Sequence, residues 1–285
     1  MRNPPLIAVA HGSRDPRAAA TVTALLDRVR LAHPELEVRA AYLDHSTPTL
    51  TDSLRGLATA VVLPLLLTEA YHSRVDLPAA LAEARARDPR PRIHYGATLG
   101  PHPLLLDVLE RRLAKAGVPV RRQYPSDVRG GGPGAVGLPA GGSSATCLAA
   151  GGLSTVGGSI GDPDTAVVLV SAGSSDASAN AVIAQMARTW AARAGWWAVV
   201  PAYASAVQPT PAQAVASLLA AGAPRVVVAP YLLAPGHFAD KVRLSALAAG
   251  AELVADVLGP APELAAILME RYTEARSERL AAIRW

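Results

Sequence analysis

Four side chains that can bind metals or transfer protons follow successive strand-like segments in the first half of the 285-residue chain. They are His11, Asp44, His72 and His102, and each comes shortly after a predicted buried strand. Ligands of open parallel sheets bind beyond the carboxyl ends of the strands, so these side chains should gather on one rim. Two imidazoles and a carboxylate suit Fe²⁺, Co²⁺, Ni²⁺ or Zn²⁺, and imidazole also titrates near neutral pH. The set predicts a metal or acid–base site, although each loop histidine taken alone is more simply a solvated side chain.

The turn after the first histidine carries further candidates for ligand binding. Ser13, Arg14 and Arg17 stand where a helix is predicted to begin, and a helix N-terminus attracts a ligand carboxylate. The alternative for Ser13 is capping of that helix. The chain has no short zinc motif, no glycine-rich phosphate-binding loop and no nucleophile elbow. The sequence therefore predicts no nucleotide-binding or acyl-transfer site.

The elements that must position these residues alternate regularly along the chain. Short apolar runs are typical of buried parallel strands, and the stretches between them are predicted helices. In the first half, strands are predicted near 6–10, 37–42, 60–67 and 92–97, and helices near 16–32, 48–58, 74–87 and 102–116. Such alternation predicts a parallel sheet with helices on both faces.

The second half repeats the first at an offset of 161 residues. Matching pairs are Gly12 with Gly173, Ala41-Tyr42 with Ala202-Tyr203, and Pro48-Thr49 with Pro209-Thr210. An internal duplication of this kind predicts an α/β chain with two tandem doubly wound, flavodoxin-like domains. We expect the two domains to face each other across a cleft. Because the duplication supplies both halves of that cleft, a monomer is sufficient.

The second half has lost most of the candidate site. Its replacements are Ala172 for His11, Ser205 for Asp44 and Ala261 for His102, and only His237 still matches His72. We therefore expect the second half to form a wall of the cleft, with a vestigial site. Lys241 and Arg243 follow His237 and are candidates for binding ligand carboxylates, with a solvated helix face as the alternative.

A glycine-rich stretch separates the two halves. Residues 125–163 hold 12 of the 23 glycines, together with many serines and alanines. Such a composition buries too little surface to offset the entropy of ordering it, so a flexible linker is predicted. The expected division is an N-terminal domain over 1–124 that carries the site, the linker over 125–163, and a degenerate C-terminal domain over 164–285. Cys147 lies within the linker and can form no intramolecular disulfide, because it is the only cysteine.

Composition and charge narrow the class of protein. Residues 1–124 carry 17 Lys and Arg against 12 Asp and Glu, whereas residues 125–285 carry 10 against 11. No basic run is interleaved with aromatic residues, so a small polyanionic ligand is favoured over nucleic acid. No apolar run approaches the roughly 18–20 residues of a membrane span. We expect a soluble cytoplasmic protein with no membrane partner.

Several short sequences together point to a family. They are AHGSR at 10–14, YLD at 42–44 with Pro48, PLLL at 64–67 leading to His72, DLP at 76–78 and LGPHP at 99–103. Taken as a set, they resemble the sirohydrochlorin chelatases, the CbiX/SirB group of class II chelatases. The resemblance is strong over 6–112 and weak over 165–272.

The resemblance implies a chelatase that inserts a divalent metal into sirohydrochlorin held between two facing domains. In that family the histidines matching His11 and His72 bind metal and transfer protons, and Asp44 matches an acidic residue that is usually Glu. The substrates would be sirohydrochlorin and Fe²⁺, favoured for siroheme, or Co²⁺, for a cobalamin precursor. The reaction needs no nucleotide and no redox cofactor. The alternatives are a metal or tetrapyrrole carrier that uses the same cleft without turnover, and a flavodoxin-like regulatory module.

Overall fold

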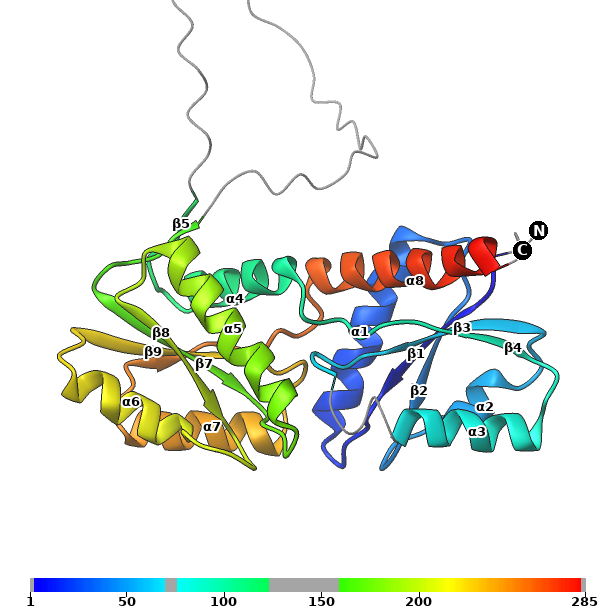
Figure 1. Cartoon of the computed structure of the whole chain (residues 1–285), viewed down its shortest axis with the longest axis horizontal. Coiled ribbons are helices and arrows are strands. Elements are labelled where there is room, and N and C mark those ends of the chain that lie inside the picture. The colour runs from blue at the N-terminus through cyan, green and yellow to red at the C-terminus, as the bar shows by residue number, and fades with distance from the viewer. Residues whose placement is uncertain (1–2, 70–75, 123–158, 283–285) are drawn as a thin grey trace, which may run out of the picture.

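The computed structural model describes residues 3–69, 76–122 and 159–282, which form two sheets lying side by side (Figure 1). The first sheet is parallel throughout, with the strand order β2-β1-β3-β4. The elements of this half are β1 (Leu6–Ala10), α1 (Pro16–Ala32), β2 (Val38–Tyr42), α2 (Leu50–Leu54), β3 (Thr59–Pro64), α3 (Leu77–Arg87), β4 (Arg92–Tyr95) and α4 (Pro103–Lys115). The predicted strand–helix alternation is confirmed for this half.

The second sheet repeats the first. Its strand order is β10-β9-β7-β8, which is the order of the first sheet when each strand is replaced by its counterpart. The elements are β7 (Thr165–Ser171), α5 (Ala177–Ala194), β8 (Ala198–Tyr203), α6 (Pro211–Ala220), β9 (Arg225–Pro230), α7 (His237–Ala248), β10 (Leu253–Val254) and α8 (Pro262–Ala282). The tandem duplication and the parallel α/β class are both confirmed.

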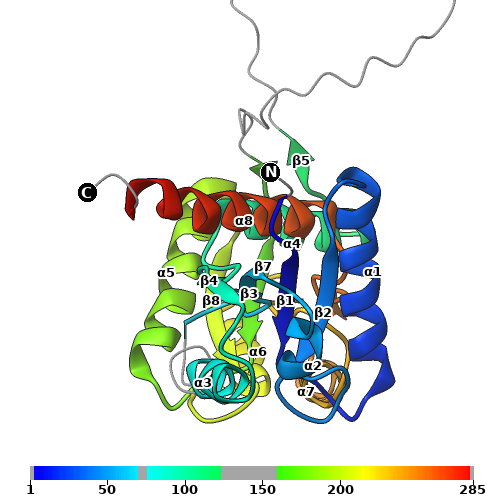
Figure 2. The ribbon, with the colours of Figure 1, turned by 90° about the vertical axis from the view of Figure 1, so that its right-hand side faces the viewer.

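The last helix of each half packs against the sheet of the other half. Helix α8 contacts β3, β4 and α1, whereas α4 contacts β9 of the second sheet. Figures 1 and 2 show α8 lying across the first half beside α1, with α4 displaced toward α5. The division of the sequence into 1–124 and 164–285 therefore separates the two sheets. It does not separate the two packed units, because each sheet is completed by a helix from the other half.

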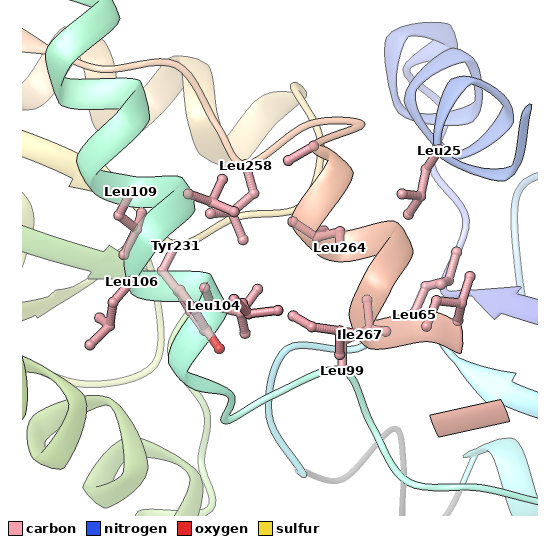
Figure 3. Packing of buried hydrophobic residues seen from close by; sticks show 14 of the residues in the cluster. Leu25, Leu65, Leu99, Leu104, Leu106, Leu109, Tyr231, Leu258, Leu264 and Ile267 are labelled. Atoms are coloured by element: carbon pink, nitrogen blue, oxygen red, sulfur yellow. The ribbon is translucent and has the colours of Figure 1, made fainter. Parts of the chain in front are cut away.

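This exchange of helices merges the inner faces of the sheets into one hydrophobic core. A single cluster of buried side chains contains residues of both sheets and of α1, α4, α5 and α8. Figure 3 shows leucines of α4 and α8, among them Leu104 and Leu264, lying between the two halves. Each fully buried leucine contributes roughly 1.5–3 kcal/mol. The outer faces are separate, covered by α2 and α3 in one half and by α6 and α7 in the other.

Polar contacts reinforce the joint between the halves. Arg111 of α4 binds Glu263 of α8 through two nitrogens, at 3.1 and 2.6 Å. The Tyr231 hydroxyl, at the end of β9, donates to the Leu67 carbonyl of the first half at 3.0 Å. Burial raises the pKa of Tyr231 far above its ordinary value, so the hydroxyl remains a donor. The two sheets are thus held in one arrangement by both apolar and polar contacts.

The described part of the second half begins within the predicted linker. Ser159–Ile160 (β6) pairs antiparallel with Arg121–Arg122 (β5), and the Gly161 amide donates to the Ala194 carbonyl at the end of α5. Residues 159–163 of the predicted linker thus belong to the described part of the chain, and the rest of it lies outside. In the described residues, no helix is long and apolar enough to cross a membrane.

Candidate functional site

The structure brings His11 and Asp44 together at the carboxyl edge of the first sheet. His11 follows β1 directly and is exposed, and Asp44 lies two residues beyond β2. The Asp44 amide donates to the His11 carbonyl at 2.9 Å, which ties the two turns to each other. Gly12 makes this close approach possible: its φ is +95°, and a Cβ there would overlap the Asp44 carbonyl oxygen. An imidazole and a carboxylate therefore share one exposed rim.

The second half has the same pair of turns without the reactive side chains. The Ser205 amide donates to the Ala172 carbonyl at 3.0 Å, and Gly173 has a φ of +83°. The Ser205 hydroxyl donates to the same carbonyl at 2.9 Å, so it is used within its own turn. The second rim thus keeps the backbone of the first, with alanine and serine at the positions of His11 and Asp44.

A hollow of about 570 Å³ opens where the second rim meets the first half. From the second half it is lined by the strand ends at 171–175, 205–206 and 231–233, and by Phe238 of α7. The first half contributes 65–68, the segment that follows β3 and leads toward His72. Most of the residues that line this hollow are apolar or have small side chains. A flat apolar ligand held here would lie between the two halves.

The second predicted metal ligand, His72, lies outside the described residues. Within the three described ranges, no group of three or more His, Cys, Asp or Glu side chains is arranged to hold a metal ion. The prediction of a His11–His72 pair therefore stays a prediction. Its counterpart His237 is exposed at the start of α7, with its ring centroid 6.0 Å from that of Phe238, one of the residues lining the hollow.

His102 is committed to other contacts. It is the N-cap of α4, where its Nδ1 accepts a hydrogen bond from the Leu104 amide at 3.2 Å. Its Nε2 lies 3.2 Å from Glu270 of α8, and only 14% of its side chain is exposed. Nδ1 thus caps α4 and Nε2 faces α8, so both ring nitrogens of His102 have partners within the fold.

The turn that opens α1 differs in detail from the prediction. Asp15, not Ser13, is the N-cap: its carboxylate accepts from the Arg17 amide at 2.9 Å. The Ser13 hydroxyl accepts from the Asp15 amide at 3.1 Å, one residue before the helix. Hydrogen bonds from Arg17 hold the pKa of Asp15 below its ordinary value. Ser13 therefore shapes the turn.

The two predicted cations of this turn differ in whether acidic side chains bind them. Arg17 is bound on both sides, by Asp15 and by Asp240 of α7, each at 2.6 Å, so it joins the halves and is not free for a ligand. Arg14, in contrast, is exposed to solvent.

Lys241 and Arg243, both on α7, contact different segments of the second half. The Lys241 ammonium donates to the Ala204 carbonyl at 3.5 Å, beside the turn that carries Ser205. Arg243 lines another hollow and lies 3.9 Å from Asp256. Lys241 therefore lies near the rim of the second sheet, and Arg243 lines the other hollow. Neither residue lines the hollow of about 570 Å³.

One residue beside Asp44 is not predicted from the sequence. His45 follows Asp44 directly, and its Nε2 lies 3.1 Å from an Asp44 carboxylate oxygen. Its only sequence signal is adjacency to Asp44, and adjacency alone does not show that two side chains meet. Glu69, after β3, is a second acidic group near this edge, and it adds to the effect of burial in raising the pKa of Tyr95.

Comparisons with known proteins agree with this architecture. The family model described as CbiX matches residues 5–116 and 166–275. A sirohydrochlorin cobaltochelatase of Priestia megaterium is 24% identical over 239 residues, covering 80% of this chain and 63% of that protein. A sirohydrochlorin ferrochelatase of Bacillus subtilis (strain 168) is 29% identical over 120 residues, covering 40% of this chain and 46% of that protein. The chain thus spans less than two thirds of the length of these relatives.

Solved structures share the fold of the whole chain. SirB from Bacillus subtilis with Fe³⁺ superposes with a TM-score of 0.71 at 20% identity, covering 96% of this chain and 95% of that one. CbiX, described as the terminal enzyme for biosynthesis of siroheme in denitrifying bacteria, gives a TM-score of 0.60 at 18% identity over 95% and 99% of the two chains. Both halves match the family model, and both sheets have the expected topology, so the chain belongs to the CbiX family.

Proposed function

We propose that this protein is a sirohydrochlorin chelatase that inserts Fe²⁺ or Co²⁺, as a substrate, into the tetrapyrrole. The observation that carries the proposal is the match of both halves to the CbiX family, whose relatives include sirohydrochlorin cobalto- and ferrochelatases. The paired His11 and Asp44 on one rim supply the imidazole and carboxylate that such a reaction requires.

Metal insertion requires a metal with labile ligands and the removal of two pyrrole protons. In our proposal His11 and His72 hold the metal on one face of the macrocycle and release it to the pyrrole nitrogens. Asp44, whose side chain is 59% exposed, or one of the histidines accepts the protons. No nucleotide or redox cofactor takes part in these steps.

The macrocycle itself would occupy the hollow between the halves. Its flat face suits the apolar lining formed by 65–68 and 231–233. Its peripheral carboxylates need cations at the edge of the hollow, and Arg14 and Lys241 are exposed on the two rims. We propose that these two residues bind carboxylates, because guanidinium and ammonium groups form strong charge-assisted hydrogen bonds with them.

The test is a multiple-turnover assay without oxygen. Pure protein is mixed with a large molar excess of sirohydrochlorin and with Fe²⁺, Co²⁺ or Ni²⁺, and the absorption spectrum is followed against a protein-free control. We expect many equivalents of metallated product per protein for iron, cobalt or both. Conversion that stops at one equivalent would instead support the carrier function. No acceleration with any metal would overturn the proposal.

A further inference from the structure

The carboxylate of Asp44 is held on both of its oxygens by the residue that follows it. The His45 amide donates to Oδ1 at 2.8 Å, and His45 Nε2 lies 3.1 Å from Oδ2. His45 takes a left-handed backbone conformation, with a φ of +57°. Among residues other than glycine, histidine is one of those that adopt this conformation most often, with asparagine and aspartate. The two contacts, from the His45 amide and from its ring to the Asp44 carboxylate, form a clamp on that side chain.

The duplicated half shows that the turn does not need this histidine. Ala206 occupies the matching position with a φ of +67°. The hydrogen bonds around it are also kept: the Ser46 amide donates to the Asp44 carbonyl at 2.7 Å, and the Val207 amide donates to the Ser205 carbonyl at 2.8 Å. Alanine thus supports the same backbone within the same fold.

The two halves differ at both members of the clamp together. Where the first half has Asp44 and His45, the second has Ser205 and Ala206, and neither can form the contact between a carboxylate and an imidazole. The half that lacks the acid also lacks the histidine, although the turn is unchanged. Folding of the turn therefore does not explain His45, and its partner Asp44 does.

We infer that His45 is a positioning residue that holds the Asp44 carboxylate in one orientation beside His11. This inference rests on the proposed chelatase function. An exposed carboxylate is otherwise free to rotate about two side-chain bonds, and a proton acceptor must be held within hydrogen-bond reach of the proton it takes. His45 acts only through Asp44 and touches no substrate.

The test compares His45→Ala and His45→Gln with the unchanged protein in the chelatase assay. His45→Ala keeps the turn, as Ala206 shows, so circular dichroism should be unchanged. We expect kcat to fall roughly 10–100-fold, the scale seen when a residue that orients a functional group is removed, with KM for sirohydrochlorin little changed. His45→Gln keeps a donor near the position of Nε2 and should recover most of the rate. His33→Ala, which removes an exposed imidazole beside Glu35 at the end of α1, should leave the rate unchanged.

A double-mutant cycle with Asp44→Ala separates positioning from other roles. If His45 acts through Asp44, then His45→Ala should have no further effect in the Asp44→Ala background. Equal losses in both backgrounds would overturn the inference, as would a kcat of His45→Ala within twofold of the unchanged protein. If the unchanged protein itself shows no turnover with any metal, the proposed function fails, and the inference fails with it.

Discussion

His11 and Ala172 occupy the same place in the two halves, one residue after the first strand of each sheet. The turns around them share a hydrogen bond: the carbonyl of each accepts from the amide two residues beyond the neighbouring strand, at 2.9 and 3.0 Å. The fold therefore accepts either histidine or alanine at this position. The same holds for Asp44 and Ser205. Replacing a residue of the first rim by the residue at the matching position of the second rim should therefore cost little stability. The second half thus indicates which substitutions the turns of the first half can accept.

Replacement of His11 by alanine should lower turnover without unfolding the protein. The variant removes a proposed metal ligand and proton acceptor, and loss of acid–base function costs roughly 10²–10⁴-fold in rate. His72→Ala should behave alike. His237→Ala should cost far less, because its partners in the second half are already Ala172 and Ser205. The rates of the three variants, measured side by side with circular dichroism, check this; an equal loss for His237→Ala would make the second half catalytic.

Replacement of Gly12 by alanine should destabilise the protein more than replacement of Gly56. Both glycines have a positive φ, +95° and +77°, which costs an alanine roughly 1–2 kcal/mol. A Cβ at Gly12 would also overlap the Asp44 carbonyl oxygen, whereas nothing lies within 4 Å of a Cβ at Gly56. Chemical denaturation gives both losses of unfolding free energy. Equal losses would show that the close approach of the two turns is not required.

At the scale of elements, local signals placed most helices and strands within a few residues. Helix α2 is shorter than predicted, Leu50–Leu54 against 48–58, because Gly56 with its positive φ lies just beyond the end of the helix. The sequence predicts the position of helix α4 along the chain correctly, but the residues that pack against α4 come from distant segments. On its inner face the nearly buried Glu110 accepts from the Trp190 indole of α5 at 3.0 Å.

A charged cluster between α4 and α5 should stabilise the exchanged position of α4. Arg193 of α5 pairs with Asp107 and lies 3.4 Å from Glu110. Arg193→Met would leave the buried Glu110 with only the Trp190 donor, so we expect a loss of roughly 1–3 kcal/mol in unfolding free energy. Arg188→Met is the matched control on the same helix, because Arg188 donates to the Gln185 side chain at the surface. Denaturation curves for the two variants compare the effects, and equal curves would mean that the cluster does not hold α4.

At the scale of the whole molecule, the exchange of α4 and α8 makes the two halves interdependent. The Tyr272 hydroxyl of α8 donates to the Pro4 carbonyl of the first half at 2.8 Å, and Arg271 donates to the Thr98 carbonyl at 3.1 Å. The shared core contains residues from both halves. The two rims are thereby fixed relative to each other, which a site between them requires.

Cleavage of the glycine-rich segment should not separate the halves. Exposed glycine-rich segments are preferred sites of proteolysis, so limited digestion should cut first within 125–158. Because each sheet keeps a helix from the other fragment, the two products should elute together from a sizing column and keep the chelatase activity. Separation of the fragments without denaturant would contradict the exchanged packing, and first cuts within 6–112 would contradict the predicted linker.

The sequence by itself determined the class of fold, the duplication and the family. Apolar runs of four to eight residues indicate buried strands, and a repeat offset of 161 residues is visible without coordinates. The carboxyl ends of parallel strands share one edge, so His11 and Asp44 could be expected on the same rim. These inferences depend on local pattern and on topology, both of which are properties of the order of residues along the chain.

Only the tertiary structure determined which side chains from distant parts of the sequence contact each other. The exchange of α4 and α8 is invisible in the sequence, because an apolar helix face fits either sheet equally well. For the same reason His102 was expected at the rim, whereas its partner Glu270 comes from a helix of the other half. The His45 clamp on Asp44 depends on one backbone angle, which no composition or spacing reports. Contacts between distant segments depend on how the whole chain packs, and local sequence carries little information about that packing.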